Sequence, residues 1–371
     1  MAEALALAER GRGRVEPNPV VGAVLVREGE VVGEGYHARH GGPHAEVEAI
    51  AAAGGAARGA TLYVTLEPCN HHGKTPPCVD AILRAGIRRV VAAMPDPNAI
   101  AAGGAERLRA AGVEVEVGLL AAEARRQNAP FLKRVRSGLP FVTLKWAMTL
   151  DGKIATASGD ARWVSSAEAR EHAHRMRDRA DAVLIGIGTA LADDPELTAR
   201  IPGGRDPLRV VADARARLPL DSKLVRTARQ SPVIVAVSAA APEGRVEALR
   251  AAGVEVLTCG DPATGSAGAG GVDLMVLARA LAARPGRPVT NLVCEGGGRL
   301  NAALLEAGLA DRVVVFVAPK ILGGAHAPTP VEGAGRERMD DAIRLAGRIE
   351  VARVGPDVLL VADLREPEAP A

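Results

Sequence analysis

The strongest signal in this chain of 371 residues lies in two segments, GYHARHGGPHAEVEAI (35–50) and TLYVTLEPCNHHGKTPPC (61–78). Together they hold one histidine and two cysteines in the order His44, Cys69 and Cys78. One imidazole and two thiolates suit a borderline-soft ion such as Zn²⁺ and leave the fourth tetrahedral position to water. The sequence therefore predicts a catalytic site with one zinc ion per chain.

Glu46 follows the first of these ligands by two residues, close enough to exchange protons with a water on the metal. Zinc lowers the pKa of such a water to near 7, which makes hydroxide available as a nucleophile. His-Ala-Glu followed by Pro-Cys and a second cysteine is the signature of zinc nucleobase deaminases. Two other interpretations stay open: His71 or His72 could close a structural zinc site, or the cysteines could be buried thiols without a metal. The ordered set of residues favours the catalytic site.

Eight residues, NHHGKTPP, separate Cys69 from Cys78, where the short signature has two to four. This insert is polar and cationic, which predicts substrate contacts beyond a bare base at the rim of the metal site. His71 and Lys74 are the candidates for these contacts, although both could be solvated loop residues.

The composition argues against several classes of protein. Net charge is +2 with acidic and basic residues interleaved, so no nucleic-acid or membrane surface stands out. Aromatic residues make up 2% of the chain, too few for stacking single-stranded bases. No apolar run reaches membrane-spanning length, and the start MAEALALAERGRG predicts an amphipathic helix rather than a signal peptide. Cys259 and Cys294 are expected to be buried thiols, which favours a reducing, cytoplasmic setting.

Alternating strand and helix patterns predict a three-layer α/β domain over residues 1–138. A hairpin is expected around Glu28-Gly29, and helices are expected to start near His44 and after Pro77. Two of the predicted ligands then lie at helix N-termini, where the positive end of the helix dipole favours thiolate over thiol.

Residues 139–371 predict a second α/β domain whose last strands, in IEVARVGPDVLLVADL, form an antiparallel hairpin at the edge of the sheet. Glycines at 186 and 188 and at 296–298 each follow an apolar strand and could bind phosphate through backbone N–H groups. Neither group completes the six-residue dinucleotide pattern. The stretch DPATGSAGAGG (261–271) is expected to be a flexible loop.

Four segments resemble the bifunctional riboflavin-biosynthesis deaminase/reductase family: NPVVGAVLV, HAEVEAI, YVTLEPCNHHGKTPPC and TLDGKIATASGDARWVSS. The resemblance covers nearly the whole chain. It implies a cytidine-deaminase-like first domain and a dihydrofolate-reductase-like second domain. The implied reactions are zinc-dependent deamination of 2,5-diamino-6-(5-phosphoribosylamino)pyrimidin-4-one, then NADPH-dependent reduction of its ribosyl group to ribityl. The expected partner is therefore this small pyrimidine ribosylamine phosphate, with no nucleic acid and no membrane, and the chain is expected to form a homo-oligomer.

The resemblance also assigns residues to each site. Asn18, which could also be a plain turn residue, joins His71 and Lys74 at the deaminase substrate. The NADPH site is implied to comprise Ala147, Trp163, Thr189, Asp193, Gly297, Gly298, Arg299, Leu300, Asn301, Ala302 and Ala303. The sugar phosphate is implied to meet Ala161, Arg177, Leu197, Arg200 and Glu295, since arginines suit a phosphate ester. Lys145 and Glu295 are candidates for polarising or protonating the sugar carbonyl, and Lys145 could equally be an anchor.

The sequence departs from the family pattern at Ala161 and Ala214, where many members carry serine. His172 and His174 are expected to be solvated.

Two alternative functions remain open from the sequence: a deaminase acting on tRNA, and a zinc scaffold with an inactive reductase domain. A third keeps the zinc half active and the reductase half silent.

Overall fold

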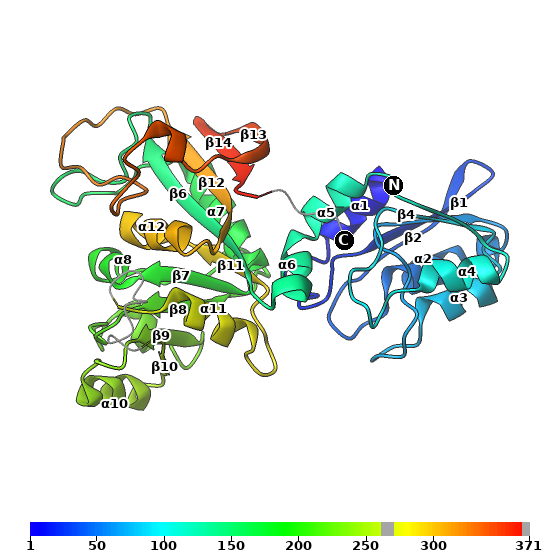
Figure 1. Ribbon diagram of the computed structural model, residues 1–371, viewed down its shortest axis with the longest axis horizontal. Coiled ribbons are helices and arrows are strands. Elements are labelled where there is room, and N and C mark those ends of the chain that lie inside the picture. Colours follow the sequence, from blue (N-terminus) through cyan, green and yellow to red (C-terminus); the bar gives the residue numbers. More distant parts are fainter. Residues whose placement is uncertain (261–270, 366–371) are drawn as a thin grey trace. The chain divides into compact units, whose positions relative to one another are not determined.

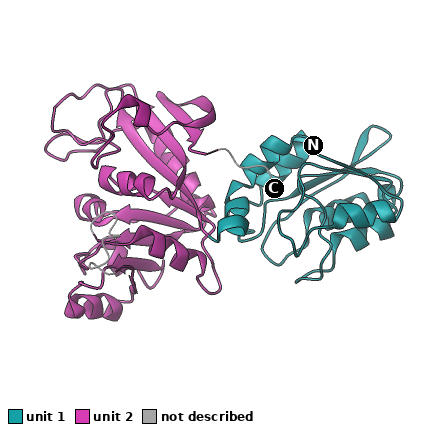
Figure 2. Cartoon of the chain, in the orientation of Figure 1, with its two compact units in different colours: residues 1–138, 367–371 teal, residues 139–366 magenta. Residues whose placement is uncertain are grey.

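The computed structural model describes residues 1–260 and 271–365, which form two compact units (Figures 1 and 2). Unit 1 comprises Met1–Gly138, and unit 2 begins at Leu139. Ten of the eleven residues of the loop expected at 261–271 lie outside the described residues. Within the described ranges, no helix is both long and apolar enough to span a membrane.

Unit 1 is built on a five-stranded sheet in the order β2-β1-β3-β4-β5. Strand β1 is antiparallel to β2 and β3, whereas β3, β4 and β5 are parallel. The elements are α1 (Ala2–Glu9), β1 (Gly22–Arg27), β2 (Glu30–Tyr36), α2 (Ala45–Ala53), η1 (Gly54–Ala57), β3 (Thr61–Val64), α3 (Cys78–Ala85), β4 (Arg89–Ala92), α4 (Gly104–Ala110), β5 (Glu114–Val117), α5 (Ala121–Gln127) and α6 (Ala129–Ser137).

Two local features of unit 1 help to position helix α2, which begins directly after the predicted ligand His44. The β1–β2 turn has positive φ at Glu28 (55°) and Gly29 (88°), the conformation of a tight hairpin turn, and this confirms the predicted hairpin. On β2, a side chain at Gly35 would collide with the backbone of Ala45 and Ala49. The missing side chain lets α2 pack directly onto the sheet, so its first residues lie at a fixed height above the strands.

Unit 2 contains a nine-stranded sheet in the order β10-β9-β8-β7-β11-β6-β12-β14-β13. The strands are parallel from β10 to β12, and β14 and β13 add an antiparallel edge, as predicted. The elements are β6 (Phe141–Thr149), α7 (Ala167–Arg179), β7 (Ala182–Gly186), α8 (Ile187–Asp193), β8 (Leu208–Ala212), α9 (Lys223–Arg226), β9 (Val233–Val237), α10 (Glu243–Ala251), β10 (Glu255–Thr258), α11 (Leu274–Ala282), β11 (Asn291–Cys294), α12 (Gly298–Glu306), β12 (Ala310–Ala318), η3 (Met339–Asp341), β13 (Ala346–Val354) and β14 (Asp357–Asp363).

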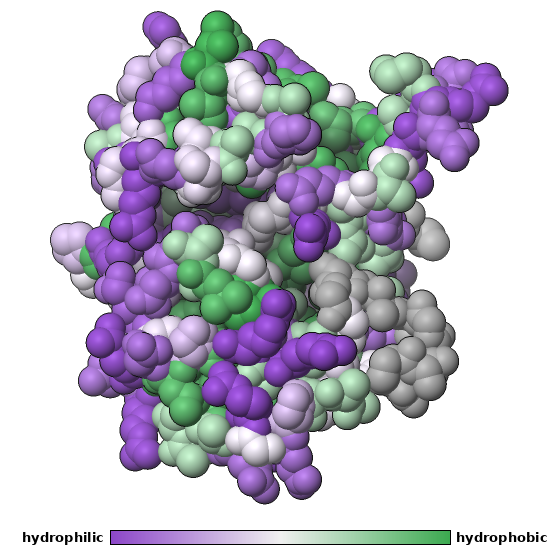
Figure 3. Space-filling view, turned by 90° about the vertical axis from the view of Figure 1, so that its left-hand side faces the viewer, coloured by the Kyte–Doolittle hydropathy of each residue, from purple (hydrophilic) through white to green (hydrophobic). Residues whose placement is uncertain are grey.

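The central strands of unit 2 are buried on both faces, which explains their continuous apolar runs. Along β7, Leu184 packs into one hydrophobic core and Ile185 into a second core on the opposite face. Strand β13 lies at the edge of the sheet (Figure 1). It differs from the central strands, because Ile349 is 45% exposed and Val351 is 66% exposed. On the face drawn in Figure 3, hydrophobic residues lie in separate groups among hydrophilic ones.

Candidate active sites

The three predicted zinc ligands converge in unit 1. His44 is the residue before α2, Cys78 is the first residue of α3, and Cys69 lies in the loop after β3. The His44 Nδ1 atom lies 3.2 Å from the Cys78 sulfur and 3.5 Å from the Cys69 sulfur. Two ligands that share a tetrahedral zinc are separated by roughly 3.5 Å, given Zn–S and Zn–N bonds of about 2.3 and 2.0 Å. The three side chains therefore fit one zinc ion.

No fourth protein donor joins this group in the part of the chain that the structure describes. His71 lines the neighbouring cavity, but neither His71 nor His72 belongs to the cluster. A site with three protein ligands is typical of catalytic zinc, whereas structural zinc takes four. This geometry argues against the closed structural site considered from the sequence.

The surroundings shift the pKa of Cys69 and that of the neighbouring Glu46 in opposite directions. A hydrogen bond from Cys78 and a further one from His44 lower the pKa of the Cys69 thiol to about 4. Glu46 is only 3% exposed, and its burial, followed by the nearby Cys69 charge, raises its pKa to about 7. A carboxyl group with a pKa near neutrality can both accept and return a proton at physiological pH.

A cavity of about 260 Å³ opens beside the cluster. The residues predicted to contact the deaminase substrate, Asn18, His71 and Lys74, all line it together with Glu46. At its rim the Lys74 Nζ atom lies 2.8 Å from His40 Nε2. The structure thus brings all of the predicted deaminase residues to one cavity except Cys78, which is buried behind it next to His44.

His37 is a cavity residue that the sequence interpretation did not single out. Its Nδ1 atom lies 2.9 Å from the Pro43 carbonyl, and its Nε2 atom lies 3.1 Å from Asn18 Nδ2. When Nδ1–H donates to Pro43, Nε2 accepts from the Asn18 amide and turns that group toward the cavity. Burial lowers the His37 pKa, which favours the neutral ring that this arrangement needs. The only signal for His37 in the sequence was its position seven residues before His44.

Asp96 is a second cavity residue that was missed. It follows the end of β4, whose parallel neighbour β3 leads to Cys69, so both loops meet at the same sheet edge. Burial raises the pKa of Asp96 to about 6, and its carboxylate accepts the backbone N–H of Asn98. The signal available in the sequence was a carboxylate four residues after the end of a buried strand.

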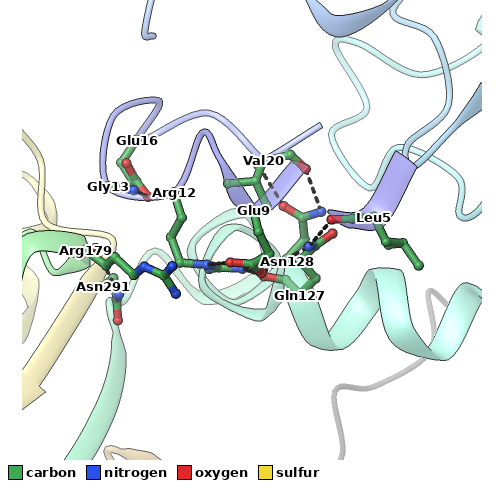
Figure 4. Close-up of polar contacts among 10 residues, drawn as sticks. All are labelled: Leu5, Glu9, Arg12, Gly13, Glu16, Val20, Gln127, Asn128, Arg179 and Asn291. Carbon is green, nitrogen blue, oxygen red and sulfur yellow. Dashed lines mark hydrogen bonds and ion pairs between the residues drawn. The ribbon is translucent and has the colours of Figure 1, made fainter. Parts of the chain in front are cut away.

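The segment that carries Asn18 is held by the junction of α5 and α6 (Figure 4). Asn128 accepts the backbone N–H of Val20 at 2.9 Å and donates to the Val20 carbonyl at 3.0 Å. Nearby, Arg12 binds both Glu9 and the Gln127 carbonyl and so ties α1 to α5. Buried polar groups therefore fix the backbone next to Asn18.

In unit 2, three predicted residues form a buried charged triad. Arg177 donates from Nε and Nη2 to the Glu295 carboxylate at 2.6 and 2.9 Å, and Lys145 Nζ lies 3.5 Å from the same carboxylate. Burial alone would raise the pKa of Glu295, but the charges of Arg177 and Lys145 outweigh it and lower the pKa to about 2. Glu295 is therefore an anion at neutral pH.

The side chains of the predicted cofactor residues differ in how far they are exposed to solvent. The Trp163 side chain is 61% exposed, with Arg170 over its ring at 4.4 Å. Gly297 precedes α12, and a side chain at Gly298 would collide with Thr329 and Glu332. In contrast, Leu300, Asn301 and Ala302 are buried, and Asn301 Nδ2 donates to the Pro330 carbonyl at 2.8 Å. The side chains of these three residues serve packing, whereas the Arg299 side chain in the same turn is 89% exposed.

The expectation that His172 and His174 are solvated was wrong. Both are partly buried, and the His172 ring packs edge-on against Phe316 with centroids 5.4 Å apart. Burial lowers the pKa of both imidazoles, and neighbouring arginines lower it further. The two histidines point in different directions from α7: His172 contacts Phe316 of β12, whereas His174 lies one turn before Arg177, which reaches Glu295.

Comparisons with known proteins agree with both halves of this description. Residues 140–360 match the family described as RibD C-terminal domain, and residues 1–94 match the cytidine and deoxycytidylate deaminase zinc-binding region. The riboflavin biosynthesis protein RibD of Actinobacillus pleuropneumoniae is 42% identical over 361 residues, which cover 97% of this chain and 93% of the relative. The RibD protein of Escherichia coli K12 is 41% identical over 376 residues, with 97% of each chain covered.

Solved structures show the same similarity. A structure of Acinetobacter baumannii RibD superposes with a TM-score of 0.82 at 36% identity and covers 98% of this chain and 97% of its own. A structure from Thermotoga maritima, titled diaminohydroxyphosphoribosylaminopyrimidine deaminase/5-amino-6-(5-phosphoribosylamino)uracil reductase, has a TM-score of 0.79 at 34% identity, with coverage of 98% and 97%. These findings confirm the predicted fold class, a deaminase-like α/β domain followed by a reductase α/β domain.

Proposed function

The chain belongs to the RibD family, and from this premise we propose how its own residues carry out the two reactions. It is a bifunctional enzyme of riboflavin biosynthesis, with a deaminase in unit 1 and a reductase in unit 2. Its substrate is the pyrimidine ribosylamine phosphate 2,5-diamino-6-(5-phosphoribosylamino)pyrimidin-4-one. Unit 1 replaces the C2 amino group by oxygen and releases ammonia, and unit 2 reduces the ribosyl group to ribityl.

In the deaminase, His44, Cys69 and Cys78 are the residues that would hold zinc. When bound, zinc supplies the Lewis acidity that activates water at neutral pH. Glu46 takes one proton from the attacking water and passes it to the ring nitrogen next to C2. It then takes the remaining proton from the new oxygen on C2 and delivers it to the amine, which leaves as ammonia while C2 becomes a carbonyl. Its burial beside the three ligands and its pKa of about 7 support both directions of transfer.

Substrate binding in unit 1 is assigned to Asn18, His71 and Lys74. The Asn18 amide, held by His37, pairs with the pyrimidine edge. His71 and Lys74 belong to the cationic insert at the cavity rim, and their donors suit the ribose phosphate. The convergence of these residues with His44 and Cys69 on one cavity is the observation that carries the proposal.

The test of unit 1 is zinc content paired with ammonia release from the purified chain. We expect about one zinc per chain and turnover of the free pyrimidine nucleotide. Deamination of tRNA in place of the nucleotide would support the alternative of a nucleic-acid deaminase. Zinc binding without ammonia release would support a non-catalytic scaffold.

In the reductase, we assign the nicotinamide cofactor NADPH to Ala147, Trp163, Thr189, Asp193 and the turn from Gly297 to Ala303. The sugar phosphate is assigned to Ala161, Arg177, Leu197, Arg200 and Glu295. Lys145 protonates the sugar oxygen as hydride arrives at the ring-opened carbonyl carbon. Glu295, which Arg177 holds as an anion, orients the Lys145 ammonium. The loss of absorbance at 340 nm with the deaminated intermediate tests this assignment, and parallel assays with NADH test the choice of cofactor.

We also propose that the chain acts as a homo-oligomer in the cytoplasm. The nine-residue edge strand β13 exposes Ile349 and Val351, and strand edges of this kind pair readily with a second copy. All four cysteines are free and buried, which suits a reducing compartment. Sedimentation equilibrium tests the assembly: a monomer at micromolar concentration would contradict it.

A further inference from the structure

The loop between α8 and β8 has an unusual backbone. It carries Leu197 and Arg200, which the proposed function assigns to the sugar phosphate. Asp194, Leu197 and Arg200 have φ values of 40°, 58° and 49°. Residues other than glycine seldom adopt this left-handed conformation, and they keep it only where the surroundings hold them there.

Two guanidinium groups hold this loop from within unit 2. Arg209 Nη1 donates to the Glu196 carbonyl at 3.2 Å, and Arg177 Nη1 donates to the Thr198 carbonyl at 3.2 Å. These two carbonyls flank Leu197, whose side chain is 2% exposed. From the other side, the backbone N–H of Ala199 donates to Asp206 Oδ1 at 2.9 Å.

Arg209 is not part of the charged triad of Arg177, Glu295 and Lys145, so its burial needs another explanation. It lies on the buried strand β8 and is 0% exposed. Its remaining hydrogen bonds go to Thr227 Oγ1 at 2.8 Å, to the Thr227 carbonyl at 3.1 Å and to the Ser231 carbonyl. None of its hydrogen-bond partners is a carboxylate.

Burying a cation without an anionic hydrogen-bond partner is costly, so the group must do something that an apolar side chain cannot. A guanidinium can donate to several carbonyls in different directions at once. Here it joins the 196–200 segment to the 227–231 segment, two stretches that the sheet itself does not connect. Its charge also strengthens each of these bonds relative to a neutral donor.

We propose that Arg209 is a positioning residue of the reductase: it holds the Leu197–Arg200 segment in the left-handed conformation that receives the sugar phosphate. This inference rests on the proposed assignment of Leu197 and Arg200 to that substrate. Arg209 acts through the loop and does not touch the reacting atoms.

The test compares Arg209→Lys with Arg245→Lys. Lysine keeps the charge but cannot donate to both segments at once. Arg245 is the matched control, because it also joins two backbone carbonyls of unit 2, those of Ala216 and Leu218, at 3.0 and 2.9 Å. We expect Arg209→Lys to raise the reductase KM for the deaminated nucleotide on the order of tenfold, with kcat and the KM for NADPH changed less than about threefold. Arg245→Lys should leave both KM values unchanged.

Asp206→Asn is a second variant, and it leaves the Arg209 side chain itself unchanged. It is isosteric and weakens the other support of the same loop, so the same selective rise in KM is expected. Amide hydrogen exchange should accelerate at residues 196–200 in both variants and not in Arg245→Lys. The deaminase rate of each variant serves as an internal control for the intact chain.

Arg200→Ala separates failure of this inference from failure of the proposed function. If it leaves the KM for the nucleotide unchanged, the loop does not bind the substrate, and both the assignment and this inference are overturned. If it raises that KM while Arg209→Lys and Asp206→Asn do not, only the positioning role is overturned. An equal rise in both KM values in Arg209→Lys would also overturn it, because general loss of structure would then explain the effect.

Discussion

Each unit buries a candidate catalytic glutamate at its active site, and the pKa values of the two are shifted in opposite directions. Glu46 in unit 1 is 3% exposed, and its burial raises its pKa to about 7. Glu295 in unit 2 has a side chain only 10% exposed, yet its pKa falls to about 2. The difference comes from their neighbours: Glu295 has Arg177 and Lys145, whereas Glu46 lies near the Cys69 thiolate.

This contrast divides the chemistry between the two units. A carboxyl group with a pKa near 7 exists in both protonation states and can carry protons during a hydrolytic deamination. A carboxylate that stays ionised down to pH 2 cannot deliver a proton at neutral pH. Of the two residues considered for protonating the sugar carbonyl, Lys145 is therefore the donor that we favour.

Replacing the proton carrier should have the largest effect. Glu46→Gln keeps the shape of the side chain and removes its ability to move protons. We expect the deaminase kcat to fall by about 10²- to 10⁴-fold, the range for lost general acid–base catalysis. Ammonia release from the pyrimidine nucleotide measures it.

Zinc content and reductase rate are the controls for Glu46→Gln. Both should stay unchanged, because Glu46 is not among the three clustered ligands and lies in the other unit from the reductase. Full deaminase turnover by this variant would contradict the contrast between the two glutamates.

Lys145→Met tests the other half of the contrast. With the ammonium removed, the sugar oxygen has no proton donor, and we expect the reductase kcat to fall about 10²-fold. Glu295→Gln should lower kcat less, about tenfold, because it only loosens the orientation of Lys145. If Lys145→Met instead raises KM and leaves kcat unchanged, Lys145 is an anchor for the substrate.

Arg177→Met should raise the pKa of Glu295, because it removes the closest cation that now lowers this pKa. The variant leaves a buried carboxylate with Lys145 as its only neighbouring cation in the triad, and we expect a loss of about 3 kcal/mol in the free energy of unfolding at pH 7. In the parent chain the ion pair stabilises unit 2 above pH 4.5, and this contribution is lost as pH falls toward 2. In the variant, protonation relieves the buried charge at higher pH, so the difference between the two chains narrows as the solution is acidified.

Tryptophan fluorescence in urea measures this difference for unit 2 alone, since both tryptophans of the chain, Trp146 and Trp163, belong to that unit. Arg284→Met is the control, because it removes a more exposed ion pair with Glu255 and should cost less than about 1 kcal/mol. An equal loss in both variants would mean that the burial of Glu295 has little energetic effect.

The metal site could be predicted because its donors are chemically distinctive and follow strand and helix signals. His44 and Cys78 stand at the starts of helices in the structure as they do in the sequence pattern. His37 could not be found in this way, since its role depends on contacts with Asn18 and Pro43 that no periodicity encodes.

In unit 2, the strand pattern correctly predicted an α/β domain with an antiparallel hairpin at the sheet edge, but not the roles of individual polar residues. Arg209 interrupts the buried apolar run LRVVA. The sequence pattern shows that interruption but cannot reveal which backbone carbonyls the Arg209 side chain binds. Asn301 was assigned to the cofactor by resemblance alone, and its side chain is buried against Pro330. Long-range contacts of this kind become visible only when the fold is assembled.

The smallest expected effect concerns Ala161, where many family members carry serine. The charged triad of unit 2 does not involve this position, so the reductase should be active without the hydroxyl. Ala161→Ser adds one neutral hydrogen bond to the substrate at most, and such a bond is worth about 0.5–1.5 kcal/mol. We therefore expect the KM for the deaminated nucleotide to fall about threefold, with kcat unchanged. A large rise in kcat would show that the reductase of this chain is impaired by Ala161, and the contrast between the two glutamates would then describe one working site and one weakened site.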